Sequence, residues 1–426
     1  MKNVGVRTIV AFVLVLALCF TLLTGCGNNA TPAGGDTAPD AAGEKTSIKI
    51  GFVAPLSGPM ANFTIGINHA AELALAAMNA DGGIYIKEYD KKLPVEIIWG
   101  DSESDSTKAS EVATKLVTES KVDILVGEWT PDTINPVSVV GERYQIPTLL
   151  ANSPDTSWLA NGPYEWSFAL LFNYDYFIDE YFNGFDRADT NKKIGLVLDS
   201  NVDGVGMAEI MASKASERGY EVVDPGRFPQ GTTDYSSVIS EIKSSGCDIM
   251  VASLLTPELV TLWNQCLQLS YQPKLVILSK GMHFSADVKN LGIVNNCIET
   301  QWSSEFPFTS SLLGKTAAEL SADFEATLNQ QADLTLGWDY ALFDVIADVL
   351  QRAETLDKTA LRDAFAATDI ECIYGHVTFA ENHVGHVPIV FGQWVADETW
   401  GVRKALIAAE HVPEVTIRED LLPMAY

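Results

Sequence analysis

The sequence predicts an α/β protein of two Rossmann-like lobes with parallel sheets, joined by a multi-strand hinge. Three observations lead to this fold class. Short apolar strands alternate with amphipathic helices, the alternation falls into two series of similar size, and a mainly helical section with further strands follows both. Continuous apolar strands of this kind are typical of parallel sheets that helices cover on both faces. With 426 residues, of which 47% are hydrophobic, the chain can bury the cores of more than one domain.

The first series of elements begins at Ser47. Its strands are expected at 48–53, 95–101, 123–127 and 146–151, and its helices at 69–80 and 107–119, with another helical stretch before the last strand. In the second helix, apolar side chains recur at spacings of three and four residues, as at Ala109, Val112, Ala113 and Leu116. This spacing places one apolar face toward the sheet.

The second series follows an aromatic-rich bridge. Its strands are expected at 192–199, 220–224, 247–253, 274–279 and 297–302, and its helices at 205–218, 235–245 and 258–269. A mainly helical section at 314–368, with a long amphipathic helix from Gly337, precedes strands expected at 373–380 and 388–396. Such a chain crosses between the lobes more than once, and the crossings make a hinge. We expect lobe 1 to comprise 47–170 and 305–378, and lobe 2 to comprise 171–304 and 379–426.

The first 26 residues are expected to be a signal peptide that takes no part in the fold. Two basic residues precede an apolar run that ends at Leu23, and small residues then lead to Cys26. This order resembles a bacterial lipoprotein signal, in which the cysteine is lipidated and becomes N-terminal after cleavage. An uncleaved anchor with an incidental cysteine is the alternative. Residues 27–46 hold no aromatic or large aliphatic side chain, which predicts a flexible linker.

The charge balance and the absence of certain motifs exclude several classes of function. The chain has 56 acidic and 28 basic residues, a formal net charge of −28. Such a surface repels phosphate backbones, so nucleic acid is not an expected partner. No GxGxxG or GxxxxGK[ST] motif occurs to hold a nucleotide phosphate, and no GxSxG or HExxH motif suggests hydrolysis. We therefore expect neither an enzyme nor a cofactor.

The cysteines and histidines indicate no chemical site. Four cysteines follow Cys26 and allow three disulfide pairings that the sequence does not rank, among Cys247, Cys266, Cys297 and Cys372. Three neighbouring histidines, His376, His383 and His386, are separated by strand and turn residues. We expect them to be exposed loop residues and not metal ligands, so no metal site is predicted.

Four short motifs occur in order in the first lobe. Pro55-Leu56-Ser57-Gly58 follows the first strand, Ala70-Ala71-Glu72 lies in the first helix, Asn79 to Gly83 ends it, and Gly100-Asp101 ends the second strand. Together they resemble the type I periplasmic binding proteins of ABC importers, in particular the leucine-binding-protein-like group that takes branched-chain amino acids. The resemblance covers nearly all of 47–395. It implies a ligand held unchanged between the lobes, ABC permease and ATPase subunits as partners, and a monomer.

The resemblance also implies which residues bind the ligand. Lobe 1 would contribute the turn after its first strand and the loops after its third and fourth strands, and lobe 2 would contribute strand ends. The expected ligand-binding residues are Ser57, Phe63, Trp129, Thr130, Asn152, Ser153, Asp203, Thr256, Lys280 and Tyr340. The alternative for Phe63 is a core contact of its own helix. The alternative for the polar residues is that their side chains are solvated and contact no ligand. Pro131 stands about where the family has a serine, and it lacks a backbone donor.

Lys280 is the largest departure from the family pattern. Amino acid binders of this family place an acidic side chain after the strand at 274–279, where it pairs with the ligand's ammonium group. A lysine would repel an ammonium group and favour a carboxylate. Unless Asp132, Asp199 or Asp203 supplies the acidic group, the ligand is expected to be an aromatic or aliphatic carboxylate, or an amide. A Lys280 side chain that points to solvent is the alternative.

The expected function is that of an extracytoplasmic lipoprotein, anchored by lipid at Cys26 to the outer face of the cell membrane or lying in the periplasm. It would capture a small carboxylate-bearing solute, similar to a branched-chain amino acid, in the cleft between its lobes and deliver it to an ABC importer. Two alternatives stay open: the ligand is a carboxylate or amide that is not an amino acid, or the protein senses its ligand for a separate receptor.

Overall fold

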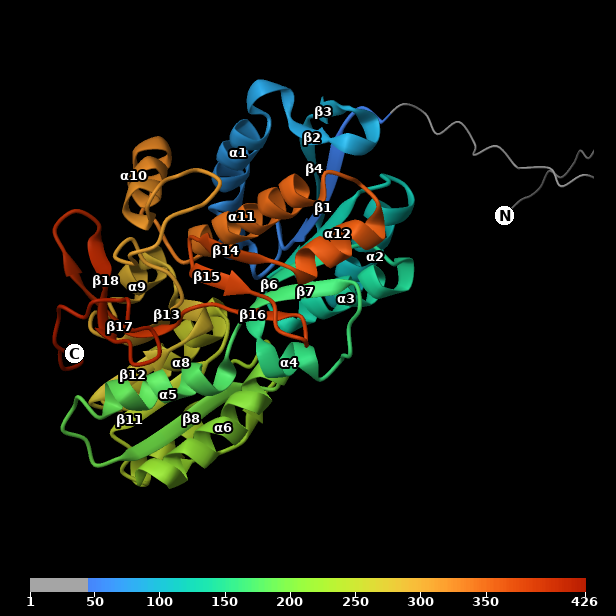
Figure 1. The fold of residues 1–426 in the computed structure, drawn as a ribbon. Coiled ribbons are helices and arrows are strands. Elements are labelled where there is room, and N and C mark those ends of the chain that lie inside the picture. The colour runs from blue at the N-terminus through green and yellow to red at the C-terminus, as the bar shows by residue number, and fades with distance from the viewer. Residues whose placement is uncertain (1–44) are drawn as a thin grey trace, which may run out of the picture. The chain divides into compact units, whose positions relative to one another are not determined.

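The computed structural model describes residues 45–426, and two mainly parallel sheets organise them (Figure 1). The expected signal peptide, with Cys26, and nearly all of the expected linker lie outside the described residues. Among residues 45–426, no helix combines the length and the apolar character needed to cross a bilayer.

The first sheet has six strands, all parallel, in the order β16-β7-β6-β5-β1-β4. They are β1 (Ile48–Ala54), β4 (Val95–Asp101), β5 (Ile124–Glu128), β6 (Thr148–Pro154), β7 (Ser167–Phe172) and β16 (Val384–His386). Every residue of β5, β6 and β7 is buried, because helices cover both faces of the sheet. Two small hairpins, β2 (Ile84–Ile86) with β3 (Lys91–Leu93) and β14 (Asp369–Cys372) with β15 (Gly375–Thr378), lie outside the large sheets.

The second sheet has eight strands in the order β10-β8-β11-β12-β13-β17-β18, with β9 beside β8. They are β8 (Lys193–Asp199), β9 (Glu221–Val223), β10 (Arg227–Phe228), β11 (Ile249–Ser253), β12 (Leu275–Leu278), β13 (Cys297–Thr300), β17 (Val390–Asp397) and β18 (Gly401–Ala408). The pairs β13–β17 and β17–β18 are antiparallel, whereas the other pairs are parallel. The return of β17 and β18 to this sheet agrees with the predicted crossing of the chain between two lobes.

The helices follow the strands in the alternation that the sequence predicts. They are α1 (Ile67–Met78), α2 (Ser106–Thr118), α3 (Pro131–Tyr144), α4 (Asp155–Leu159), α5 (Tyr174–Phe185), α6 (Val202–Arg218), α7 (Ser236–Ser244), α8 (Thr256–Gln268), α9 (Ser285–Leu291), α10 (Ala317–Leu328), α11 (Thr335–Ala353) and α12 (Lys358–Ala366). Local chemistry sets several ends: Asp105 caps α2, Thr316 and Glu319 form a capping box on α10, and Gly219 ends α6 in the left-handed conformation.

One of the expected lobe boundaries does not agree with the sheets. Strand β16 pairs in parallel with β7 of the first sheet, through Val384 opposite Ala169 and His386 opposite Leu171. The segment 384–386 was expected in lobe 2, but it extends the first sheet. The other expected boundaries stay a prediction.

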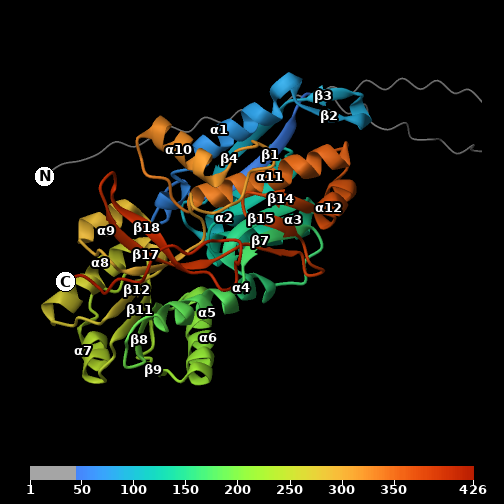
Figure 2. The same cartoon turned by 60° about the vertical axis from the view of Figure 1, so that its left-hand side comes forward.

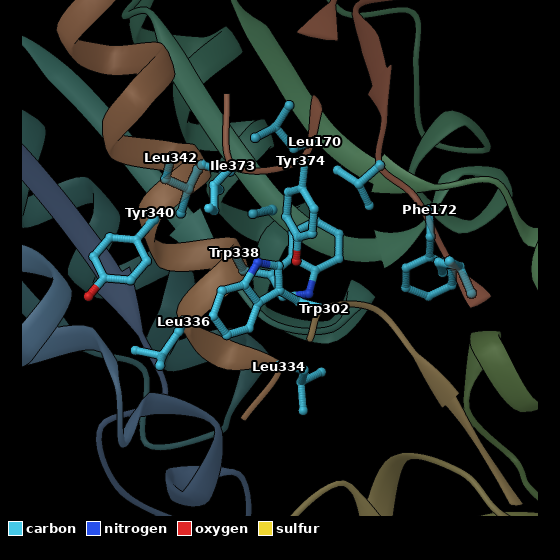
Figure 3. Packing of buried hydrophobic residues seen from close by; sticks show 14 of the residues in the cluster. Leu170, Phe172, Trp302, Leu334, Leu336, Trp338, Tyr340, Leu342, Ile373 and Tyr374 are labelled. Atoms are coloured by element: carbon cyan, nitrogen blue, oxygen red, sulfur yellow. The ribbon is translucent and has the colours of Figure 1, made fainter. Parts of the chain in front are cut away.

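Helix α11 is buried on all sides over most of its length, and not amphipathic as expected. Its residues from Thr335 to Ala347 are buried without a break. Figure 3 shows its side chains packed among Trp302, Ile373 and Tyr374, which come from distant parts of the chain. A helix that is surrounded in this way has no solvent face to carry a polar stripe.

The four described cysteines are free and buried, so the structure contains none of the three pairings. Two of the three histidines are exposed, His376 on β15 and His386 on β16. His383 is not: its ring stacks on Phe168 with 4.2 Å between centroids. No three metal-binding side chains gather within residues 45–426.

Candidate functional site

A cavity of about 60 Å³ lies between the carboxyl ends of strands from the two sheets. From the first sheet and its loops it is lined by Phe63, Trp129, Thr130, Pro131, Asn152, Ser153 and Pro154. Its remaining lining residues are Phe172, Tyr174, Phe177, Asp203, Met207, Ser253, Leu255, Ser279, Lys280, His283, Glu299, Gln301 and Leu334. The carboxyl ends of parallel strands are the usual place for a ligand in α/β folds.

Two tight turns form the wall on the first sheet. Trp129, Thr130 and Asn152 adopt positive φ angles of 69°, 63° and 61°, which non-glycine residues rarely adopt. The turns hold each other, because Trp129 N donates to Ala151 O at 3.2 Å and Thr130 N donates to Asn152 O at 3.0 Å. The conformation places Thr130 at the start of α3, where its hydroxyl is buried without a hydrogen-bond partner.

Aromatic rings enclose much of the cavity. The ring of Phe63 packs against Trp129 and Phe284, with centroids 4.9 and 5.1 Å apart. On the other side, Phe177 stacks against Phe172 at 5.2 Å and meets Tyr174 edge-on at 5.5 Å. Phe63 therefore lines the cavity and bridges elements, and it is not simply a core contact of its own helix. Such a wall favours an apolar or aromatic body in the ligand.

Lys280 does not present a free positive charge to the cavity. Its ammonium lies 2.5 Å from a carboxylate oxygen of Asp199 and 2.7 Å from one of Asp203. Burial alone would lower the pKa of Lys280, but the two aspartates raise it above its ordinary value. With 15% of its side chain exposed, the residue does not point to solvent either. The alternative that Lys280 points to solvent is therefore wrong, whereas its expected preference for a carboxylate stays a prediction. Its ammonium is already paired with two carboxylates of the protein.

Asp132 adds a further carboxyl from the opposite wall. Burial and the nearby Asp203 raise the pKa of Asp132, while Lys280 lowers it. The three aspartates that the sequence singled out thus surround Lys280 from both sides of the cleft. Burial also raises the pKa of Asp199, although Lys280 lowers it. The carboxyl groups here outnumber the single ammonium.

Glu299 lies at the back of the cavity in a buried polar network. It accepts hydrogen bonds from the hydroxyls of Tyr181 and Ser279, at 2.5 and 2.6 Å, and from His283 Nε2 at 3.0 Å. Burial alone would raise the pKa of Glu299, but His283 and the two hydroxyls lower it below its ordinary value. Burial lowers the pKa of His283, although Glu299 raises it. The network places a carboxyl group behind the cavity.

A hydrogen-bonded chain crosses the cleft near this network. Gln301, which follows β13, accepts from Asn152 Nδ2 at 3.1 Å and from Trp338 Nε1 at 2.9 Å. Asn152 belongs to the first sheet, so the bond joins the two halves of the molecule directly.

The structure brings together seven of the ten expected residues and leaves three elsewhere. Ser57 is exposed and bonds Asp101, with its hydroxyl at 2.7 Å from Oδ2. Thr256 lies beside the cavity, but its hydroxyl donates to Gly281 O at 2.9 Å. Tyr340 is buried in the core, and Figure 3 shows it pointing away from Trp338 and Tyr374.

Sequence reasoning missed several lining residues. Glu299 and Gln301 follow the same rule as the residues that were found, since they end strand β13. The polar residues in Cys297 to Trp302 were a usable signal for them. Tyr174 and Phe177 lie on α5, within a stretch interpreted only as an aromatic-rich bridge.

Comparison with known proteins agrees with this architecture. A family model described as "Periplasmic binding protein" matches residues 47–399. The Leu/Ile/Val-binding protein homolog 7 of Brucella abortus (strain 2308) is 23% identical over 345 residues, which cover 78% of this chain and 84% of that protein.

Two similar solved structures hold different ligands. The branched-chain amino acid transporter substrate binding protein LivJ of Streptococcus pneumoniae, in complex with isoleucine, has 20% identity and a TM-score of 0.69 over 85% of this chain and 100% of its own. A solute binding protein of an ABC transporter from Rhodopseudomonas palustris BisB5, in complex with 3,4-dihydroxybenzoic acid, has 14% identity and a TM-score of 0.69 over 85% of this chain and 98% of its own. Both share the type I fold of two α/β lobes. With a family model spanning most of its length, the chain belongs to the periplasmic binding proteins, extracytoplasmic proteins that bind small solutes without converting them.

Proposed function

We propose that this protein captures a small zwitterionic solute, similar to a branched-chain amino acid, between its two lobes and delivers it to an ABC importer. The observation that carries the proposal is the arrangement of charge around an aromatic cavity. Unpaired hydrogen-bond donors lie on the first lobe, while the carboxyl groups on the second outnumber the single ammonium of Lys280.

The carboxylate end of the solute would face the first lobe. The Thr130 hydroxyl has no partner and lies at the start of the 14-residue helix α3. The N-terminus of a helix favours anions, because its free amides and its dipole point toward them. Pro131 removes one amide donor from this end, which makes the Thr130 hydroxyl more important.

The ammonium end would face the second lobe. Asp199 and Asp203 share Lys280, and Glu299 lies behind them, so three carboxyl groups stand against one ammonium. A ligand that carries a positive group improves this balance, whereas a simple carboxylate makes it worse. In the family one acidic residue pairs with the ligand's ammonium group. Here Asp203 and its neighbouring carboxyl groups would share that interaction.

An aromatic carboxylate without an amine is the second candidate. The rings of Phe63, Trp129, Phe172 and Phe177 favour it, and a structure of the same fold holds 3,4-dihydroxybenzoic acid. The excess of carboxylates in the cleft opposes it.

Thermal unfolding in the presence of candidate solutes separates these possibilities. L-Leucine and L-isoleucine are expected to raise the melting temperature in a concentration-dependent way, because a ligand at 100 times its Kd stabilises the folded state by about 2.7 kcal/mol. 4-Methylpentanoate, which is leucine without its amine, is expected to stabilise less. Asp203→Asn should reduce the response to leucine more than the response to 4-methylpentanoate. A larger shift with 4-methylpentanoate or 3,4-dihydroxybenzoate than with either amino acid contradicts the zwitterion proposal.

The cellular role rests on delivery from the membrane surface. We infer a lipid anchor at Cys26 and an ABC permease with its ATPase as partners. Cell fractionation should find the protein with the membrane and a Cys26→Ser variant released from it. Loss of the protein should reduce uptake of the radiolabelled solute; unchanged uptake with an altered response to the solute would instead favour a sensing lipoprotein.

A further inference from the structure

A second cavity, of about 100 Å³, lies beside β17 and β18, the antiparallel edge of the second sheet. Three segments line it: residues 302–305 after β13, α10 with the loop that follows it, and strands β17 and β18. It shares no lining residue with the cavity in the cleft. Gln331, in the loop after α10, donates to Val402 O of β18 at 3.0 Å, which holds two of these segments together. Figure 2 shows α10 above β17 and β18 on the same side of the molecule.

The lining of this cavity carries an unusual number of unsatisfied polar groups. Trp302 Nε1, Ser321 Oγ, Gln331 Oε1 and Lys404 Nζ are all buried, and none of them has a hydrogen-bond partner. The indole N–H, the hydroxyl and the ammonium are donors. Buried polar atoms are nearly always satisfied in folded proteins, so a group of four around one cavity indicates a missing partner.

Lys404 is the strongest of these signals. Its ammonium has neither a hydrogen-bond partner nor a carboxylate oxygen within 4.0 Å among residues 45–426. It lies 5.1 Å from the centre of the Trp394 ring. Burial lowers the pKa of Lys404 to about 8, although Asp333 and Glu299 raise it. A buried charge without a close counterion is costly, so the site gains free energy from an anion.

We propose that this second cavity binds a small monovalent carboxylate, of the size of formate or acetate, through Lys404, Trp302 and Ser321. The proposal does not depend on which solute occupies the cleft.

The other charged groups around the cavity restrict the anion to one charge. Glu325 accepts from Ala332 N at 3.1 Å, and Asp333 accepts from the amide and hydroxyl of Thr335 at 2.8 and 2.7 Å. Arg403 is bound by both oxygens of Glu419, at 2.7 and 2.9 Å, and exposed Glu305 completes the charged lining. These acidic groups repel a dianion such as sulfate, whereas a monoanion at Lys404 is balanced by the ammonium.

Occupation of the cavity would connect the two lobes. Ser321 lies on α10, whose Phe324 meets His69 of α1 edge-on at 5.5 Å between centroids, and α1 packs in the first lobe. Lys404 belongs to β18 of the second sheet. An anion held by both therefore stabilises the observed arrangement of the lobes.

Thermal unfolding at pH 7, without any solute, tests the proposal. Sodium formate or acetate should give a saturable rise in melting temperature, beyond the effect of sodium sulfate at equal ionic strength. Lys404→Met should abolish the rise, and Lys108→Met, which removes an exposed lysine from α2, should retain it. The rise should also disappear above pH 9, where Lys404 loses its proton.

Two further variants keep the test decisive. If Lys404→Met fails to fold, Ser321→Ala and Trp302→Phe each remove one neutral donor and should weaken carboxylate binding about tenfold, the equivalent of 1.4 kcal/mol. In Thr130→Ala any part of the response that belongs to the cleft is lost, and the part that depends on Lys404 should remain. The proposal is overturned by the absence of a saturable response, by an unchanged response in Lys404→Met, or by a response that disappears in Thr130→Ala.

Discussion

Glu128 and Asp339 form a pair of buried carboxyl groups directly beneath the cleft. Both residues are fully buried, and Glu128 immediately precedes Trp129 of the cavity wall. Burial raises the pKa of Glu128 to about 8. Burial and the charge of Glu128 raise the pKa of Asp339 well above its ordinary value. Because no cation acts on either group among the described residues, the pair retains at least one proton at neutral pH.

The pair predicts that stability falls as the pH rises. The pKa of Glu128 is raised in the folded state from 4.5 to about 8, so its contribution is complete below pH 4.5 and is lost as the pH approaches 8. The loss at pH 7 is on the order of 3 kcal/mol, at 1.36 kcal/mol for each unit. Glu128→Gln, which imitates the protonated acid, should unfold at a higher temperature than the wild type at pH 8, with a smaller difference at pH 5. Glu111→Gln, on the exposed face of α2, is the control; a pH-independent difference for Glu128→Gln would contradict the assignment.

The cavity residues could be predicted wherever a contact follows from position at a strand end. Trp129 and Asn152 stand at such ends, and the family resemblance added Phe63. The ion pairs of Lys280 could not be predicted, because Asp199 and Asp203 are about 80 residues away in the sequence and only the folded chain brings them together. The sequence alone does not show which carboxylates pair with a given lysine.

Most strands and helices of the two sheets could be predicted from their periodicity. Strands β1, β4 and β11 and helices α2 and α8 lie within a few residues of their expected positions. Strand β7 and helix α5 were missed. They adjoin in one long apolar and aromatic stretch, SFALLFNYDYFIDEYFNGF. The helical period of α5 was a usable signal, because its apolar side chains recur at spacings of three and four residues from Tyr174 to Phe185. Strand β7 shows no period of two, because it is buried on both faces.

Gly337 lies in the first turn of helix α11, where its missing side chain allows close packing. A Cβ at Gly337 would lie 2.3 Å from Trp302 Cγ, so the helix and the indole touch directly. Gly337→Ala gains about 1 kcal/mol in helix propensity but displaces a buried tryptophan, and we expect a net destabilisation of about 1–3 kcal/mol in urea unfolding.

Gly206→Ala in α6 is the matched substitution for this test. Its Cβ would meet only Tyr174 Cε1, at 3.3 Å, so it should leave stability unchanged or raise it by less than about 1 kcal/mol. Equal changes in the free energy of unfolding for the two variants would show that Trp302 can move aside without destabilising the protein.

The two halves of the molecule meet through a small number of direct polar contacts. The bond from Asn152 to Gln301 crosses the cleft, and the aspartates around Lys280 come from both sides of it. In hinged receptors such contacts form on closure around a ligand. Small-angle scattering should therefore give a smaller radius of gyration with saturating solute than without it, and Gln301→Ala should reduce the difference. Identical dimensions with and without a solute that binds tightly would exclude closure.

The path of the chain also limits how this protein can be divided. The first sheet takes its strands from 48–172 and again from 384–386, and the second takes them from 193–300 and again from 390–408. Neither half is therefore encoded by one continuous stretch of sequence. A single cut anywhere between 193 and 384 leaves neither sheet complete in either fragment, so a lobe free of segments from the other can be produced only by splicing separate segments. Removal of 384–408, for example, would take strands from both sheets at once, so deletion mapping, which assumes that function resides in contiguous pieces, would not assign a function to either half.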